Sequence, residues 1–401
     1  MNAMLIYNAR VVTPERVLER GAVYVADGVI GEVTEGYPGR LPENTPAGPA
    51  RIDAQGKLLL PGLIDLHTDA MDVEIVPRRG ADFPIEVAFR ELERRMSGCG
   101  ITTVFHSLHL GYRAAEIISN SKYRREEVFE GVYQAARKRT LVHNLIHLRF
   151  ELTGTWDYDL ACGLIERGYV SLLSIMDHTP GQGQFGMEAF LAASVRGGMS
   201  REEALEKLAE KRALPQLTPP QLATMIGLAR DRSVPVASHD DYTPEKVRQM
   251  HRAGVRVCEF PITLEVAREA KRLGMSVVGG SSNVLRGGSL SGNLNVLDGI
   301  RAAAIDSLCS DYYPPSLLHS VIKIAREGVL SMPEAVKLAT LHPARAAGIA
   351  DRTGSIEPGK HADLLLVDVV DGLPLVTHTI VNGHLAAQAT LQPQPEKAWM
   401  Y

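Results

Sequence analysis

The chain has 401 residues, of which 45% are hydrophobic and 22% charged, so it can bury the core of one large domain and a smaller one. Its formal net charge of -4 gives no electrostatic signature for nucleic acid or for an anionic membrane, and neither partner is expected. The four widely spaced cysteines, with no charged-then-apolar leader and no apolar run of membrane-spanning length, predict a cytoplasmic protein with reduced thiols.

The sequence patterns at both ends of the chain predict short strands separated by Gly, Pro and Asp. The predicted strands cover 5–12, 22–25, 30–33 and 57–60 at the start, and 362–369 and 377–383 at the end. Because each set needs a partner for its apolar faces, we predict that residues 1–60 and 350–401 build one composite β-sandwich domain. Two unrelated extensions are the alternative.

Residues 58–69 join this domain to the rest of the chain. An apolar run closed by Pro61-Gly62 is followed by a strand pattern that ends at His67 and Asp69. Residues two apart on a strand point to the same side, and both would lean into the mouth of a parallel barrel if this strand is its first. An imidazole and a carboxylate aimed at one point suit a divalent metal. The alternative is a His–Asp hydrogen bond at a strand end.

Residues 61–349 alternate between strand and helix patterns. The predicted strands cover 63–66, 102–106, 143–151, 169–178, 234–239, 255–260, 276–280 and 306–311. The helices after them are predicted at 87–96, 121–139, 159–167, 219–230, 244–253, 264–273 and 294–304. About eight such units predict an α/β fold with a (β/α)8 TIM-like barrel. A doubly wound open sheet is the alternative, but no G-x-G-x-x-G opens a first helix.

One interval, residues 179–218, is too long for a simple connection. It follows the fourth predicted strand directly and contains a charged helix pattern at 201–212. A long insertion at the catalytic face of a barrel is often a lid, and an oligomer contact is the alternative.

Five of the predicted barrel strands end in a candidate metal ligand or base. These side chains are His67, Asp69, Glu151, His178, His239 and Asp311. A barrel would gather them at one mouth, where a dinuclear site with a shared carboxylate activates water for hydrolysis. Glu151 is the predicted bridge, because no Lys that could be carboxylated ends the third or fourth strand, and Asp311 is the predicted general base. Separately satisfied polar residues are the alternative.

A glycine-rich stretch at 279–293 follows the seventh predicted strand. Barrels commonly bind phosphate in the loops after strands seven and eight, where backbone N–H groups and a fixed cation approach an oxyanion. The predicted phosphate-binding residues are Ser282, Asn283, Arg286, Gly287, Gly288 and Ser289. A flexible glycine loop is the alternative. Arg78, Arg79 and Arg149 lie near other strand ends and are further candidates, or ordinary surface charges.

Several motifs together resemble the amidohydrolase superfamily and, within it, the branch of phosphonate metabolism. They are Pro61–His67, the triplet His67-Thr68-Asp69 where most relatives have His-x-His, Asn283–Ser289, and Ser310–Leu318. The resemblance spans nearly the whole chain. It implies hydrolysis of ribose 1-methylphosphonate 5-triphosphate, a small phosphorylated sugar, to the 5-phosphate and pyrophosphate by a metal-activated water.

The same resemblance implies roles for single residues. Asp311 would be the general base, and the loop around Arg286 would bind the phosphates. The metal ligands would be His67, Asp69, Glu151, His178 and His239. Two divalent ions are implied, zinc first, with manganese, iron or nickel as alternatives. Two positions depart from the pattern: Ala70 stands where Asn is expected, and His106 where a carboxylate or another polar residue is usual.

Two other functions remain open on the sequence. The same metal centre hydrolyses or deaminates cyclic amides, imides and amines elsewhere in the superfamily. A non-catalytic interaction protein on the same fold is the second alternative. A homodimer is expected only because dimers are the commonest oligomers of soluble proteins.

Overall fold

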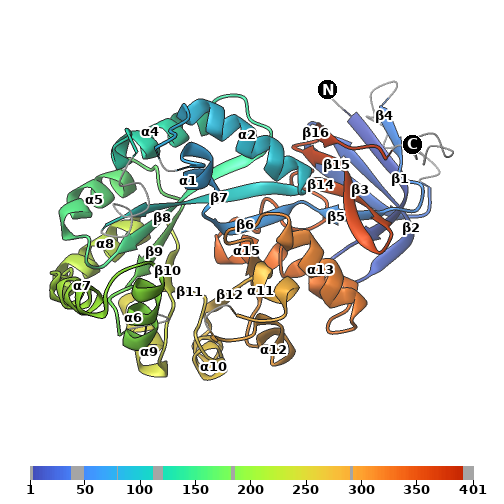
Figure 1. The fold of residues 1–401 in the computed structure, drawn as a ribbon. Helices are drawn as coiled ribbons and strands as arrows, with labels where there is room; N and C mark the ends of the chain where they lie inside the picture. The colour runs from blue at the N-terminus through green and yellow to red at the C-terminus, as the bar shows by residue number, and fades with distance from the viewer. Residues whose placement is uncertain are drawn as a thin grey trace, which may run out of the picture.

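The computed structural model describes residues 3–37, 49–78, 80–111, 121–181, 186–289 and 292–391. Figure 1 shows a barrel of strands surrounded by helices, with a second sheet beside it in which the blue and red ends of the chain lie together. Within the described ranges, no helix is long and apolar enough to cross a membrane.

Eight parallel strands form the nearly closed barrel, which confirms the predicted fold class. They follow one another in sequence order from β6 to β13, and each pairs in parallel with the next. Their bounds are β6 (Leu63–Thr68), β7 (Ile101–Leu110), β8 (His143–Glu151), β9 (Leu172–Met176), β10 (Val236–His239), β11 (Val257–Glu259), β12 (Ser276–Gly280) and β13 (Ser307–Cys309).

Helices cover the outside of the barrel. Five of the described helices begin after a Ser or Thr whose hydroxyl accepts a backbone N–H of the first turn, at Ser200, Thr218, Thr243, Thr263 and Ser331. The sequence did not predict the short helix α1, and it placed both ends of α12 too far out. The helices between β6 and β13 are α1 (Ala70–Ile75), α2 (Ile85–Gly98), α4 (Arg125–Ala136), η1 (Thr155–Asp157), α5 (Tyr158–Glu166), α6 (Met187–Arg196), α7 (Arg201–Ala213), α8 (Pro219–Asp231), α9 (Pro244–Ala253), α10 (Leu264–Arg272), α11 (Ser281–Arg286) and α12 (Val296–Arg301).

Three more helices, α13 (Ser316–Arg326), α14 (Met332–Lys337) and α15 (Leu341–Ala346), follow β13. The last of them lies at the floor of the barrel, the end opposite the mouth. Ala344 of α15 belongs to the same buried apolar cluster as Phe105, Leu172, Val257 and other inward-facing strand residues. The interior of the barrel is therefore a packed core at this end.

The first and last strands of the barrel meet only near the mouth. There Asp311 N–H donates to the carbonyl of His67 at 2.9 Å, and Asp69 N–H donates to the carbonyl of Asp311 at 2.8 Å. Toward the floor, Ile64 N–H bonds to Ala339 and Leu308 N–H to Leu338, so the chain after α14 fills the seam between β6 and β13.

A second sheet gathers strands from both ends of the chain. Its order is β16-β15-β14-β5-β1-β2-β3, with β4 paired to β1, and it is mixed because β1 pairs in parallel with β4 and β5. The predicted domain limits at 60/61 and 349/350 stay a prediction. The strands are β1 (Ala3–Val12), β2 (Val17–Ala26), β3 (Val29–Glu35), β4 (Ala50–Asp53), β5 (Leu58–Pro61), β14 (Leu364–Val370), β15 (Leu373–Val381) and β16 (His384–Gln388).

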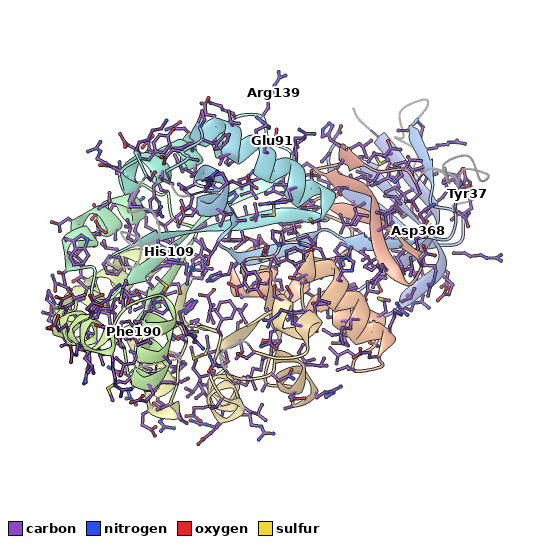
Figure 2. The ribbon with its side chains drawn as sticks, viewed as in Figure 1. Tyr37, Glu91, His109, Arg139, Phe190 and Asp368 are labelled. Carbon is purple, nitrogen blue, oxygen red and sulfur yellow. The ribbon has the colours of Figure 1, made fainter. Side chains whose placement is uncertain are left out.

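The insertion at 179–218 contains α6 and α7, which pack on each other through Leu191, Ala204 and Leu208. Figure 2 labels Phe190 there, on the opposite side of the molecule from Asp368 of the terminal sheet and from Tyr37, which follows β3. Gln182–Gln184 lie outside the described residues, as do Arg79, Leu290 and Ser291. The role of the insertion as a lid or oligomer contact stays a prediction.

Candidate metal centre at the barrel mouth

Four imidazole rings form a continuous row across the mouth of the barrel. His147 of β8, His67 of β6 and His239 of β10 lie in this order, with ring centroids 5.2 Å and 5.5 Å apart, and His178 follows 5.5 Å beyond His239. The ring of Phe260 lies 5.0 Å from both His67 and His239. Three of these histidines were predicted as metal ligands.

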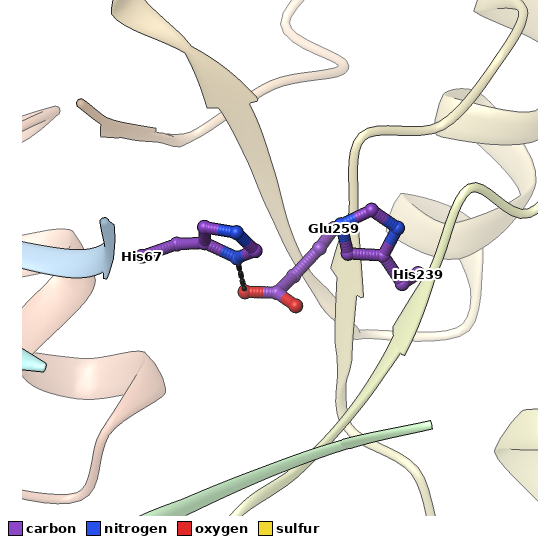
Figure 3. Close-up of side chains that lie close together, drawn as sticks. All are labelled: His67, His239 and Glu259. Carbon is purple, nitrogen blue, oxygen red and sulfur yellow. Dashed lines mark hydrogen bonds and ion pairs between the residues drawn. The ribbon is translucent and has the colours of Figure 1, made fainter. Parts of the chain in front are cut away.

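Glu259, at the end of β11, lies beneath this row. Its Oε1 is 3.3 Å from His67 Nδ1, and its Oε2 accepts the Ser174 hydroxyl at 2.8 Å, as the close-up in Figure 3 shows for His67. Burial by itself would raise the pKa of Glu259, but the imidazoles of His147 and His67 outweigh it and hold this pKa well below its usual range. An ionised carboxylate is therefore buried among imidazoles. One ligand atom each of His67, His239 and Glu259 lies within 4.8 Å of the others.

A second group is formed by His67, Asp69 and Asp311, whose ligand atoms also lie within 4.8 Å of one another. His67 Nε2 is 3.8 Å from Asp69 Oδ1, as expected for residues two apart at a strand end. Burial raises the pKa of Asp311 to about 6, which suits a group that accepts a proton near neutral pH.

A third group is formed by His178, His239 and Asp240. Asp240 Oδ2 lies 3.5 Å from His178 Nε2 and 3.2 Å from His239 Nδ1. Glu151 approaches His178 from the other side, because its carboxylate accepts the His178 backbone N–H at 2.7 Å and lies 2.6 Å from the ring Nδ1. A carboxylate on the far nitrogen of a histidine fixes the ring for metal binding through the other nitrogen.

The backbone at the mouth is strained at three positions. Asp240, Phe260 and Asp311 each follow a barrel strand and have φ values of 55°, 53° and 62°. Left-handed backbone is costly for residues other than glycine, above all for a bulky one such as Phe260, and it concentrates at functional sites. The turns that follow β10, β11 and β13 are therefore shaped for the position of these side chains.

Arg149 lies between the groups of candidate ligands. Its guanidinium donates to Asp69 Oδ1 at 2.7 Å and contacts His239 Nε2 at 3.2 Å and His109 Nε2 at 2.5 Å. His109, labelled in Figure 2, lies in turn 3.5 Å from Asp72. Burial lowers the pKa of His109 to about 4, so its ring is neutral and accepts from Arg149. The arginine therefore places a buried positive charge at the mouth.

His147 gives a direct reason to expect a cation here. Its Nδ1 lies 2.9 Å from the carbonyl of Leu66 and therefore carries the proton. Its Nε2 lies 3.8 Å from Glu259 Oε2 and is buried with no hydrogen-bond partner among the described residues. A buried imidazole nitrogen without a partner, beside a buried carboxylate, is a position that a positive ion would fill. The donor set of imidazoles and carboxylates fits a divalent metal.

A cavity of about 330 Å³ opens from this centre toward the predicted phosphate loop. Its walls include Asp69, Arg149, His239 and Asp311. They also include Ser282, Asn283, Arg286, Gly288 and Ser289. The candidate metal ligands and the candidate phosphate ligands therefore share one space.

The predicted phosphate-binding residues of the loop differ in their other contacts and in their exposure. The Asn283 side chain bonds to the carbonyl of Leu294 and to the N–H of Val296, so it already holds the loop in shape. Ser282 is buried and donates to the carbonyl of Ser310 at 3.3 Å. Arg286 is exposed at the end of α11 and lines the cavity. Its guanidinium is the positive charge that the loop offers to a phosphate.

The two departures noted in the sequence lie in different places. His106 bonds to Asn144 at 2.8 Å, and its ring lies 5.8 Å from that of Phe89 in α2, so it faces the helix layer and not the mouth. Ala70 is buried as the first residue of α1. Neither side chain contributes a polar atom to the mouth.

The five predicted metal ligands and the predicted base all lie at the mouth. Sequence reasoning missed Glu259, Asp240 and His147. A signal for Glu259 was present. Because Val257 faces the barrel core, its neighbour two residues on must face inward too. His147 precedes Arg149 and Glu151 with the same spacing of two. Asp240 lies beyond the strand, and its position depends on the strained turn that no periodicity predicts.

Comparisons with known proteins agree on one family. Residues 192–386 match the model of the amidohydrolase family. The chain is 34% identical over 387 residues to the α-D-ribose 1-methylphosphonate 5-triphosphate diphosphatase of Escherichia coli (strain K12), covering 95% of this chain and 99% of that protein. It is 26% identical to the imidazolonepropionase of Mesorhizobium japonicum, covering 92% and 91%. A crystal structure of a Xaa-Pro dipeptidase with bound methionine aligns with a TM-score of 0.64 at 16% identity, covering 97% of this chain and all of that one.

Proposed function

Because the chain belongs to the amidohydrolase family, whose members are hydrolases, we propose that it cleaves a phosphoric anhydride in a ribosyl 5-triphosphate. The proposed substrate is α-D-ribose 1-methylphosphonate 5-triphosphate, and the products are the 5-phosphate and pyrophosphate. The named relative from Escherichia coli supports this choice. The observation that carries it is the cavity that joins the carboxylates and histidines of the mouth to Arg286 and its glycine-rich loop.

We further propose two divalent ions, zinc first, as the cofactor. His67, Asp69, His178 and His239 would hold them, together with Asp240 or Glu259, which lie within the same ligand groups. When bound, such ions supply a Lewis acid that lowers the pKa of water and neutralises charge on a phosphoryl oxygen. Glu151 was predicted to bridge the ions, but its contacts favour a role in orienting His178.

In the proposed reaction, a water oxygen attacks the α-phosphorus. The bond from this phosphorus to the bridging oxygen of the β-phosphate breaks, and pyrophosphate leaves with the electron pair. Asp311 takes the proton of the attacking water, for which its pKa of about 6 is suited. Arg286 and the glycine-rich loop would bind the terminal phosphates, and the buried charge of Arg149 would face the oxygens nearest the attack.

The test is a substrate screen with the metal-loaded enzyme and its Arg286→Ala variant. We expect pyrophosphate release from ribosyl and nucleoside 5-triphosphates, and in water enriched in ¹⁸O we expect the label in the 5-phosphate. A charge-assisted hydrogen bond contributes about 1.5–3 kcal/mol, so Arg286→Ala should raise KM for the triphosphate by roughly ten- to a hundredfold. Arg301→Ala, which removes an exposed arginine of α12, is the matched control.

Two outcomes would contradict this proposal. An unchanged KM in Arg286→Ala, with turnover of cyclic amides or imides, would assign the chain to the carbon–nitrogen chemistry of relatives such as imidazolonepropionase. Purified protein that binds less than about one equivalent of zinc, manganese, iron or nickel would support a non-catalytic interaction protein.

A further inference from the structure

A second cluster of metal-ligating side chains lies far from the mouth. His143 begins β8, whose other end carries Glu151, so nine residues of strand place the two about 26 Å apart. His361 and Asp363 lie just before β14 of the terminal sheet. One ligand atom from each of the three side chains lies within 4.8 Å of the others.

The carboxylate of this cluster is held in place by several hydrogen bonds. Asp363 is 3% exposed; its Oδ2 accepts the Thr353 hydroxyl at 2.9 Å, and its Oδ1 accepts the backbone N–H of Asn382 at 2.9 Å. An ionised carboxylate has about four lone-pair positions, so these two bonds leave room for a cation.

The two imidazoles approach this carboxylate from the barrel and from the terminal sheet. His143 Nε2 lies 3.2 Å from Asp363 Oδ1, and the His143 and His361 ring centroids are 5.9 Å apart at an angle of 39°. The His361 ring makes no hydrogen bond to any residue that the structure describes. Both histidines are half-buried, so an ion can enter from solvent and then lose part of its hydration.

We propose that His143, His361 and Asp363 bind one zinc-class divalent ion, separate from the centre at the mouth. Two imidazole nitrogens and a carboxylate oxygen are a ligand set that Zn²⁺ prefers, with the fourth position left to water. The ion would cross-link the first residue of β8 to the segment that enters β14. Asp363 also accepts the backbone N–H of Gly62 through its carbonyl at 2.8 Å, so the ion would brace the point where the chain passes from the terminal sheet into β6.

The test uses full-length protein that has been stripped with a chelator and reloaded with ZnCl₂. We expect His361→Ala to bind one equivalent less than the parent chain, with affinity at this site weakened at least about a hundredfold. His378→Ala, a half-buried histidine of β15 in the same sheet, is the matched control and should bind as the parent does. Zinc should also raise the Tm of the parent more than that of His361→Ala, and hydrolysis at the mouth should be unchanged.

A second variant keeps the experiment decisive if His361→Ala folds poorly. His143→Gln retains a donor for Asp363 and removes the imidazole, and it should lose the same equivalent. Repeating the count in the His239→Ala background separates this ion from those of the mouth. Equal zinc equivalents and equal Tm rises in the parent, His361→Ala and His143→Gln would overturn the proposal and leave a His–Asp hydrogen bond between the two sheets.

Discussion

The mouth and the floor of the barrel are built by the same strands but carry opposite side chains. On β11, Val257 packs in the apolar floor, and Glu259, two residues on, lies among the histidines. On β8, Leu145 packs against that floor, and Arg149 lies among the candidate ligands. Each of these strands therefore stabilises the fold through apolar burial at one end and places buried charge at the other, so stability and the proposed chemistry are separated by position along a strand.

If the mouth serves chemistry, Asp311→Asn should give the largest effect. Removing the proposed general base should lower kcat by about 10²–10⁴-fold, because an amide cannot accept the proton of water. Steady-state pyrophosphate release measures the loss. Asp298→Asn, an exposed carboxylate of α12 that pairs with Arg301, should leave kcat unchanged. A loss below about threefold in Asp311→Asn would remove Asp311 from the proposed chemistry.

The same variant should not lose stability. In the metal-free chain, the pKa of Asp311 is raised from 3.8 to about 6 by burial, so the folded state holds a proton that the unfolded state releases. The free energy of unfolding should therefore fall as pH rises between about 4 and 6, and Asp311→Asn should show a weaker fall. Urea unfolding of chelator-treated protein across this range measures the difference. A steeper fall of the free energy of unfolding with pH in the variant would contradict the raised pKa of Asp311.

The floor should behave in the opposite way. Phe105 is 1% exposed within the barrel core, and Phe105→Ala should lower the free energy of unfolding by about 3–5 kcal/mol through lost burial and the cavity left behind. The molecules that stay folded should keep their kcat. Phe83→Ala, which truncates a phenylalanine that is 48% exposed, is the control and should cost far less. A similar cost in both variants would mean that the floor is not the stabilising end.

The smallest effect is expected at Glu151. If this carboxylate orients His178 through Nδ1, Glu151→Gln should weaken zinc affinity at the mouth by about 10–100-fold and keep the number of ions at saturation. Competition with a chromophoric chelator gives the affinity, and elemental analysis gives the number. Loss of a whole equivalent would instead support the bridging role predicted from the sequence.

The sequence predicted the barrel and much of its mouth for a physical reason. Each buried parallel strand is a short apolar run, and the polar residue that stops it, such as His67 or His239, marks the mouth. Glu259 was missed because the predicted strand extended one residue further, to Phe260, so Glu259 was not recognised as the inward-facing residue at its end. The central place of Arg149 could not be predicted, because it depends on contacts with Asp69 and His239 that only the closed barrel creates. The approach of His143 to His361 depends in the same way on how the two sheets pack.

The seam between β6 and β13 joins the closure of the barrel to the proposed site. The backbone bonds between Asp311 and His67 that join the two ends of the wall also set the proposed base beside its metal ligand. Toward the floor, Leu338 and Ala339 lie between the two strands and accept the backbone N–H groups of Leu308 and Ile64. A local opening that begins at this joint would therefore separate the proposed base from His67 while the other strand pairs of the barrel stayed paired.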